Sequence, residues 1–307
     1  MKSIVLIISY FGKWPLWFDA HLVSIAANSD IHWLCPTDCE IPKNHPPNIK
    51  FLPTTLSKLN SRINQAVLAE VPLTYRKLCD LKLAYGDIFQ EEIKEYDFWG
   101  ICDMDIIWGD IRTFITEDVL STYDIISSRK HNTSGHFTIF KNQKQLNTLY
   151  KSIPDYKSKL ETVQLQRMDE EILTEYLWQK INHPSKQTFQ IKWDSILCNQ
   201  ENGRDSHQEY YLDTWLWKDG KMLELKNGKP VNEVMYLHFI NWKRTMKYSQ
   251  VNYKDNPNSF YISYKGIHYI PHSGFSKALN GIKNLFNGYY AILSRKYILK
   301  KIKKRLK

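Results

Sequence analysis

Glycine is scarce in this sequence, and the positions of the glycines exclude several kinds of phosphate-binding and hydrolytic site. The chain of 307 residues has only 12 glycines. No two of them are spaced as in the GxGxxG dinucleotide-binding motif, and none form a Walker A loop before a lysine. A GxSxG nucleophile elbow is also absent. If the protein binds phosphates, groups other than a glycine-rich loop must hold them.

Cysteine is rare as well, and the apolar runs are short. Five cysteines, an odd number in a chain of this length, do not indicate a disulfide framework. Cys35 and Cys39 have histidines nearby, but no second cysteine pair follows, so reduced thiols explain them better than a zinc site. No stretch approaches about 18 apolar residues, and Ile4–Ile8 is too short for the core of a signal peptide. We therefore expect a cytoplasmic protein, free or on the inner face of a membrane.

Acidic residues are missing from the last part of the chain. Residues 256–307 contain 11 Lys and Arg and no Asp or Glu, whereas residues 1–255 contain 31 basic and 32 acidic residues. The near-neutral body argues against nucleic acid as a partner. We predict a catalytic domain over residues 1–255. We interpret residues 256–307 as a basic amphipathic helical tail that binds an anionic membrane surface; a solvated helix or a disordered end is the alternative.

The order of the expected elements predicts an α/β fold. Strands are expected at residues 4–8, 31–34, 49–52, 96–102, 125–127 and 137–140, and helices at 16–27, 56–69, 75–89, 143–150 and 169–179. This alternation is typical of a mostly parallel sheet flanked by helices. Shorter strands are expected between residues 183 and 239, with turns at Asp219-Gly220 and Asn227-Gly228. Because ligands of such sheets bind at the carboxyl ends of strands, Ser9–Gly12 and Asp103–Asp105 are the first places to look for a site.

Two aspartates follow the expected strand Tyr96–Cys102, and apolar residues resume directly after them. Two carboxylates in an apolar setting are unfavourable unless a cation or hydrogen bonds meet them. Alternate residues of an extended backbone point the same way, so Asp103 and Asp105 can converge on one ion. Carboxylate oxygens favour Mg²⁺ and Mn²⁺. The segment therefore predicts a metal site, with a solvated loop or a helix N-cap as the alternative.

Four motifs, taken in order, resemble those of the GT-A-fold glycosyltransferases that use nucleotide sugars. Asp103–Asp110 is similar to the DxD region of the group of bacterial lipopolysaccharide galactosyltransferases and glycogenin. Ser134–Asn142 resembles a strand of that group that lies against the donor and acceptor sugars. Asp169–Leu173 resembles the start of a helix that contacts the donor. His238–Lys243 resembles a late motif, although its lysine comes one residue early. The resemblance covers roughly residues 1–245, and it implies a GT-A-like fold.

The resemblance also implies ligands for the metal and the diphosphate. His238 would be the third metal ligand beside Asp103 and Asp105, and a neutral imidazole suits Mn²⁺ better than Mg²⁺. Lys243, or Arg244 next to it, would neutralise the leaving diphosphate. A core histidine bonded to a backbone carbonyl and two surface cations are the plain alternatives.

Other matching residues would contact the sugars. Asp169 and Glu170 would be catalytic residues near the anomeric carbon, and Gly135 would lie where donor and acceptor meet. Glu170 replaces a glutamine of the group, and a carboxylate there is able to serve as nucleophile or base. Acidic residues in the first turn of a helix are also favoured by the helix dipole without any function.

The nucleotide has candidate contacts in two segments. Ser9 and Tyr10 follow the first strand, where the tyrosine ring is able to stack on a base. Lys77–Gly86 resembles a segment of GT-A-like proteins of surface-polysaccharide loci, which implies nucleotide contacts for Asp80 and Lys82. Two residues apart on a helix, these side chains point to different faces, and an ordinary charged helix surface is the alternative.

These observations predict a metal-dependent glycosyltransferase that uses Mn²⁺ or Mg²⁺ and a nucleotide sugar, expected to be a UDP-sugar. Its product would be a bacterial surface glycan, capsule or lipopolysaccharide, formed with retention of configuration at a peripheral position on the inner face of the cell membrane. Two other classes stay open. One is a non-catalytic membrane- or nucleic-acid-binding protein with a vestigial DxD. The other is a metal-dependent phosphohydrolase that uses the same acids.

Overall fold

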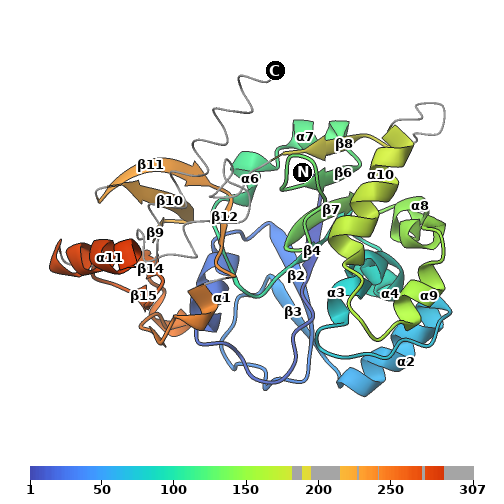
Figure 1. Cartoon of the computed structure of the whole chain (residues 1–307), viewed down its shortest axis with the longest axis horizontal. Coiled ribbons are helices and arrows are strands. Elements are labelled where there is room, and N and C mark those ends of the chain that lie inside the picture. Colours follow the sequence, from blue (N-terminus) through green and yellow to red (C-terminus); the bar gives the residue numbers. More distant parts are fainter. Residues whose placement is uncertain (182–188, 195–214, 227, 241, 272–273, 287–307) are drawn as a thin grey trace.

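The computed structural model describes residues 1–181, 189–194, 215–226, 228–240, 242–271 and 274–286 (Figure 1). A sheet of seven strands has the order β3-β2-β1-β4-β7-β6-β8. Its strands are β1 (Ile4–Ile7), β2 (Ile31–Thr37), β3 (Ile49–Pro53), β4 (Phe98–Cys102), β6 (Ile125–Ser127), β7 (Phe137–Lys141) and β8 (Ile191–Trp193). β1 pairs in parallel with β2 and β4, while β7 runs antiparallel between β4 and β6. The expected α/β class with a mostly parallel sheet is confirmed.

Helices cover both faces of this sheet because β1 is apolar on both sides. Ile4 and Leu6 belong to a core with α1 (Phe18–Ala26), whereas Val5 and Ile7 belong to a second core with α2 (Leu56–Val67). Figure 1 shows α1 on one side of β1–β3 and α2 to α4 on the other. The remaining helices of the first part of the chain are α3 (Leu78–Leu81), η1 (Lys82–Ala84), α4 (Tyr85–Ile88), α5 (Gln90–Ile93), α6 (Ile111–Phe114), α7 (Glu117–Thr122), α8 (Lys144–Asn147), η2 (Leu149–Ser152), α9 (Tyr156–Glu161), the π-helix η3 (Met168–Ile172) and α10 (Leu173–Ile181).

A second sheet of six strands has the order β11-β10-β9-β14-β15-β13. Its strands are β9 (Trp215–Lys218), β10 (Lys221–Lys226), β11 (Lys229–Val234), β13 (Tyr248–Ser249), β14 (Ser259–Ser263) and β15 (Gly266–His268). Asp219 and Gly220 both have positive φ between the paired residues Lys218 and Lys221, which is the type I′ geometry that the Asp-Gly pair favours. The second expected turn includes Asn227, which lies outside the described residues.

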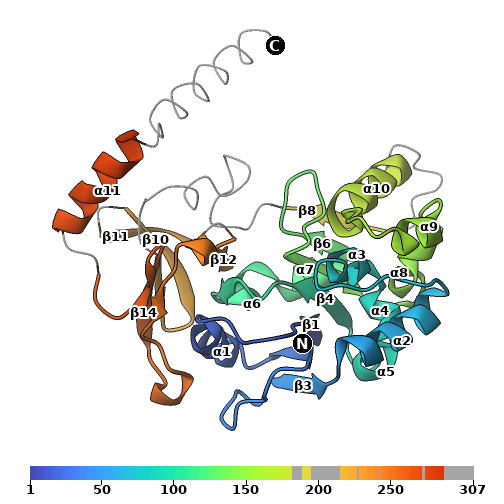
Figure 2. The ribbon, with the colours of Figure 1, turned by 60° about the horizontal axis from the view of Figure 1, so that its bottom comes forward.

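The C-terminal part of the described chain supplies strands to this second sheet. β14 pairs with β9, so strands after residue 255 complete a sheet that begins before it. The short helices η6 (Trp242–Arg244) and η7 (Tyr253–Asp255) precede β14, and α11 (Gly274–Phe286) follows β15. Figure 2 shows α11 standing out from the body on the side of the second sheet. The rest of the expected tail, residues 287–307, lies outside the described residues.

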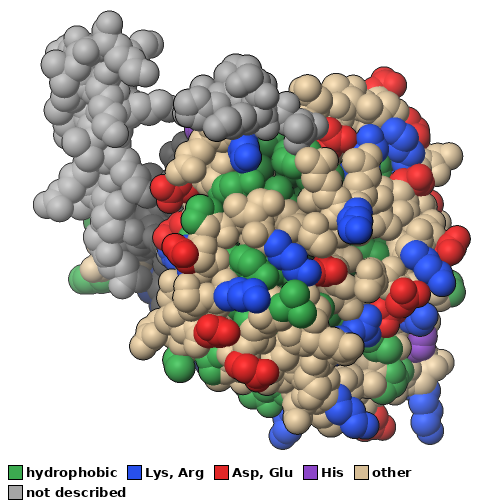
Figure 3. All heavy atoms as spheres, turned by 90° about the vertical axis from the view of Figure 1, so that its right-hand side faces the viewer, with side chains coloured by type: hydrophobic (Ala, Val, Ile, Leu, Met, Phe, Trp, Pro, Cys, Tyr) green, Lys and Arg blue, Asp and Glu red, His purple; other side chains and the backbone are tan. Residues whose placement is uncertain are grey.

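Charges of both signs are mixed on the body. On the face drawn in Figure 3, acidic and basic side chains lie side by side among apolar ones. This mixture agrees with the near balance of charge over residues 1–255. No helix among the described residues is long and apolar enough to cross a bilayer.

The expected helix over residues 75–89 is divided. The spacing of residues 75–89 predicts a single helix, but the structure has α3, the 3₁₀ turn η1 and α4 in its place. The turn begins at Lys82, whose side chain is 10% exposed and points into the protein. Periodicity of apolar residues does not reveal an inward lysine, because its partners come from segments far along the chain.

Candidate functional site

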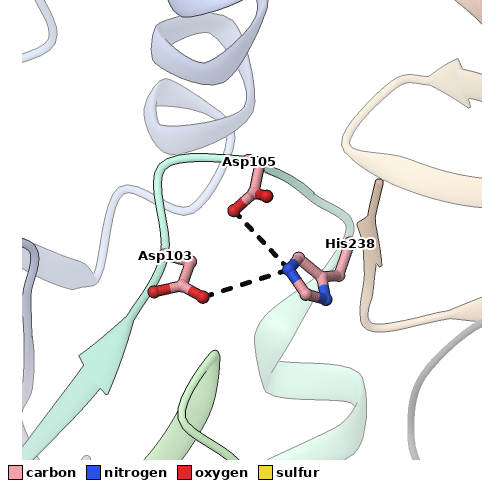
Figure 4. Close-up of side chains that lie close together, drawn as sticks. All are labelled: Asp103, Asp105 and His238. Atoms are coloured by element: carbon pink, nitrogen blue, oxygen red, sulfur yellow. Dashed lines mark ion pairs between the residues drawn. The ribbon is translucent and has the colours of Figure 1, made fainter. Parts of the chain in front are cut away.

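Three side chains converge at the carboxyl end of β4. Asp103 and Asp105 follow this strand, and β5 (Ile106–Trp108) comes next. β5 pairs antiparallel with β12 (Tyr236–His238), which places His238 opposite Ile106. Figure 4 shows the two carboxylates and the imidazole pointing toward one another. The pairing of two three-residue strands is therefore what closes the site.

Asp103, Asp105 and His238 form a triad. In each of its two carboxylates, one oxygen faces a lysine and the other faces the imidazole. One oxygen of Asp103, Oδ1, contacts Lys82 Nζ, while Oδ2 lies 3.9 Å from His238 Nε2. One oxygen of Asp105, Oδ2, lies 2.8 Å from Lys243 Nζ, while Oδ1 lies 3.5 Å from His238 Nε2. One ligand atom from each of the three residues lies within 4.8 Å of the others. The two oxygens that face the histidine are the ones available to a metal ion.

The two aspartates differ in their surroundings. The Asp105 side chain is 9% exposed and that of Asp103 is 32% exposed. Burial raises the pKa of Asp105, but His238 and Lys243 outweigh this effect and hold it well below its ordinary value. Asp105 is therefore a carboxylate over the physiological range of pH, as a metal ligand must be.

Helix α1 and its N-cap residue hold the backbone of the acidic segment. Trp17 Nε1 donates to the carbonyl of Met104 over 2.8 Å, and His21 Nδ1 lies 2.6 Å from the carbonyl of Ile106. Burial lowers the pKa of His21 to about 4, so its neutral imidazole donates the proton of Nδ1 to that carbonyl. The sequence did not indicate either residue, since both look like ordinary members of an apolar helix.

Lys82 connects the triad to Asp169. Besides Asp103, its ammonium donates to the Gly135 carbonyl over 2.6 Å and lies 3.9 Å from Asp169 Oδ2. Burial disfavours the charged lysine, but the attraction of Asp103 and Asp169 holds its pKa well above the ordinary value. Burial also raises the pKa of Asp169 to about 7, although Lys82 acts in the opposite direction.

Gly135 allows Asp169 to come this close. A Cβ at residue 135 would lie 2.2 Å from Asp169 Oδ2. Asp169 belongs to η3 and its neighbour Glu170 lies 3.4 Å from Arg129. The structure thus brings Lys82, Gly135 and Asp169 together with the triad, and Glu170 lies at the edge of this group.

Asp80 makes protein contacts of its own. Its carboxylate lies 2.9 Å from Lys77 Nζ and accepts hydrogen bonds from the backbone N–H groups of Gln166 and Met168. These contacts fix the chain just before Asp169. A direct contact of Asp80 with a nucleotide stays a prediction.

Ser9 and Tyr10 follow β1 next to the acidic segment, and Tyr10 still forms a backbone bridge with Thr37 of β2. Ile7 of β1 pairs with Ile101 of β4, so the residues after these two strands are neighbours. Tyr10 is half-buried and stacks on Trp14 with a distance of 5.5 Å between ring centroids. Burial raises its pKa, and negative charge at Cys39 and Asp105 adds to the effect. Asp110, by contrast, is the N-cap of α6 and accepts from Thr113 N.

His136 is a further buried residue of the site, and no sequence motif marks it by itself. Its ring stacks on that of His238, with 4.3 Å between centroids. Burial, together with the charges of His238 and Arg129, holds the pKa of His136 well below the ordinary value. Its position directly after Gly135 was the only signal, because the expected sugar-binding strand includes it.

Residues 6–271 match a protein family that is described as a family of unknown function, DUF6625. The chain belongs to the DUF6625 family. A comparison with curated proteins gave no significant match.

Two solved structures are similar to this DUF6625 chain at a low level. One is the galactosyltransferase LgtC in complex with donor and acceptor sugar analogs, with 11% identity, a TM-score of 0.42, and coverage of 76% of this chain and 86% of that chain. The other is the glycosyltransferase GlyE of Streptococcus pneumoniae TIGR4, with 10% identity, a TM-score of 0.34, and coverage of 57% of this chain and 43% of that chain. With TM-scores this low, the function has to be inferred from the site itself.

Proposed function

We propose that this DUF6625 protein is a metal-dependent glycosyltransferase that takes a sugar from a nucleotide sugar, with a UDP-sugar as the donor. The contacts of the two DxD carboxylates carry the proposal. One oxygen of each carboxylate faces a lysine, and the other faces His238. Such an arrangement provides a place for one cation and for two ammonium groups beside it. A diphosphate with its metal ion is the ligand that matches these charges.

The donor atoms of the triad fit Mn²⁺ or Mg²⁺. Two ligands on opposite sides of one such ion lie about 4 Å apart, and the three ligand atoms here lie within 4.8 Å of one another. Two carboxylate oxygens and one imidazole nitrogen suit Mn²⁺ best. When bound, the ion would neutralise the donor diphosphate and act as a Lewis acid toward the leaving group.

The other residues of the site have roles that follow from their contacts. Lys243 has a side chain that is 40% exposed, so its ammonium is able to turn from Asp105 to a phosphate oxygen. Lys82 holds Asp169 in place, and the buried Asp169 is the group we assign to the face of the donor sugar. Transfer with retention would use Asp169 or Glu170 as nucleophile or base.

Thermal unfolding with a panel of nucleotide sugars, each with and without Mn²⁺, tests this proposal. We expect stabilisation only when the metal and a uridine diphosphate group are both present, because each completes the charge balance of the other. Asp103→Asn should abolish the shift. Asp110→Asn is the matched control, since Asp110 caps α6 and asparagine caps equally well. A wild-type protein that no combination stabilises would contradict the proposal.

An activity assay separates the proposal from the other classes. Incubation with a UDP-sugar, Mn²⁺ and a glycan acceptor should release UDP in proportion to the glycosylated product. A phosphohydrolase would instead release phosphate without an acceptor, and a binding protein would release neither. The acceptor that we propose is a bacterial surface glycan of the capsule or lipopolysaccharide type.

The membrane surface is proposed as a partner through α11. The apolar residues Phe275, Leu279, Ile282 and Leu285 are 76%, 43%, 52% and 64% exposed, and their spacing places them on one side of the helix. The basic residues of the sequence around and after α11, without a single acid, complement an anionic surface. A lipid-linked acceptor would suit this position.

Co-sedimentation with vesicles tests the membrane partner. The double variant Leu279→Ser/Ile282→Ser should lose binding to vesicles that contain phosphatidylglycerol, while Val163→Ser, which is 67% exposed on another face, should keep it. Equal sedimentation of all three proteins would contradict a role for α11.

A further inference from the structure

A directed chain of hydrogen bonds runs from His136 to a backbone carbonyl. His136 Nδ1 lies 2.9 Å from the hydroxyl of Tyr236, and this hydroxyl lies 2.7 Å from Ser128 Oγ. Ser128 Oγ in turn donates to the carbonyl of Phe137 over 3.3 Å. All four residues are buried.

The carbonyl at the end fixes the direction of every bond in the chain. A carbonyl only accepts, so the hydroxyl proton of Ser128 goes to Phe137, and Ser128 accepts from Tyr236. Tyr236 has a single hydroxyl proton, which this bond uses. The bond between Tyr236 and His136 therefore needs the proton of His136 Nδ1, and the neutral ring has its lone pair on Nε2.

This lone pair has no protein partner among the described residues. His136 is 2% exposed, and its Nε2 is buried without a hydrogen bond. A buried acceptor without a partner is unfavourable, and it calls for an explanation such as a ligand. The ring stacks on His238, so the atom lies beside the candidate metal site rather than in a remote part of the core.

We propose that His136 is a further ligand-binding residue, whose Nε2 accepts a hydrogen bond from an O–H group of the bound ligand beside His238. The inference deepens the proposed function and rests on it. The O–H group belongs either to a sugar hydroxyl or to a water molecule on the metal ion, and the same lone pair serves both. The Ser128–Tyr236 chain is what keeps Nε2 free of a proton.

Nitrogen NMR of histidine-labelled protein tests the tautomer first. In the full-length protein without ligand, we expect a protonated Nδ1 and an unprotonated Nε2 for His136, assigned by comparison with His136→Phe. In Tyr236→Phe, the Nδ1–H form loses its acceptor, and the two tautomers should become mixed. A protonated Nε2 in the wild-type protein would overturn the proposal.

Binding measurements then identify the source of the O–H group. His136→Phe keeps an aromatic ring against His238 and removes both nitrogens. If a sugar hydroxyl is the donor, this variant should bind Mn²⁺ and UDP normally and lose about 10-fold in affinity for the UDP-sugar. If a metal-bound water is the donor, the loss of about 10-fold should already be found with Mn²⁺ alone. Tyr236→Phe, which retains the imidazole, should show a smaller loss in the same experiment.

Unchanged affinities of His136→Phe for Mn²⁺ and for the UDP-sugar would overturn the inference, provided that its near-ultraviolet circular dichroism matches the wild type. Should the variant be unfolded, Tyr236→Phe decides the question by the same measurements. A wild-type protein that binds Mn²⁺ and no nucleotide sugar would contradict the proposed function, while the Mn²⁺ comparison would still decide the role of His136.

Discussion

Two lysine–aspartate pairs begin in the same short segment of the chain and lie in different surroundings. Lys77 and Asp80 are 1% and 0% exposed, and the backbone of residues 159–168 provides their other partners. Lys82 and Asp103 are 10% and 32% exposed, and one oxygen of Asp103 faces the candidate metal site. Protein groups satisfy the first pair, whereas in the second pair one carboxylate oxygen faces the candidate metal site. Within six residues of the sequence, Lys77 belongs to the scaffold and Lys82 belongs to the candidate site.

The largest effect should come from breaking the pair Lys77 and Asp80. Asp80→Asn leaves the ammonium of Lys77 buried without a counter-charge, and we expect it to lower the free energy of unfolding by about 3–5 kcal/mol. Asp103→Asn should lower it by no more than about 1 kcal/mol, because the side chain is partly in solvent and Lys82 keeps Asp169. Urea unfolding measures both. Equal losses would remove the distinction between the two pairs.

We expect acid to lower the free energy of unfolding through the protonation of His21. Its pKa is about 4 in the folded protein and about 6.5 when unfolded, so the unfolded state binds more protons between these values. This histidine therefore costs no stability above pH 6.5, and as the pH falls to 4 the free energy of unfolding should decrease by about 3 kcal/mol.

His21→Asn provides the comparison for this prediction. The amide is able to donate to the Ile106 carbonyl and does not titrate. Urea unfolding at a series of pH values should show that the variant loses about 3 kcal/mol less than the wild type between pH 6.5 and 4. Parallel curves for the two proteins would mean that His21 is not buried as a neutral ring.

A smaller loss of stability is expected at Gly135, which lies next to the pair Lys82 and Asp103. Gly135→Ala should displace Asp169, because the new Cβ would lie 2.2 Å from its Oδ2. We expect a loss of up to about 100-fold in kcat and of about 1–3 kcal/mol in stability. Gly281→Ala is the control, since nothing lies within 4 Å of its Cβ position in α11. This control should be stabilised by about 0.5–1 kcal/mol. Steady-state kinetics and urea unfolding check both, and normal kcat in Gly135→Ala would contradict the placement of Asp169.

Much of the parallel half was predictable from the sequence. The strands at residues 4–8, 31–34 and 96–102 were expected close to their observed positions, because buried parallel strands are continuous apolar runs bounded by turn residues. The acidic segment after β4 was found for the same reason, since carboxylates stand out against an apolar strand. The three residues Asp103, Asp105 and His238 do come together.

The groups around the triad were harder to predict. The sequence is compatible with Lys82 as a surface helix residue or as a nucleotide contact, whereas the structure places it at the start of a 3₁₀ turn and in contact with Asp103. His136 and Tyr236 have no spacing that marks them, because their contact joins the residue before β7 to β12 across a hundred positions. Side chains that meet only through tertiary pairing leave no local pattern.

The short ladder between β5 and β12 has a consequence for biosynthesis. A nascent chain acquires both aspartates early, but the imidazole that completes the triad emerges from the ribosome only with β12. Until then the candidate metal site has only two of its three side chains, which disfavours metal capture by an incomplete chain. If the triad binds a metal ion as proposed, binding would report that synthesis has passed residue 238 and that β12 has paired with β5.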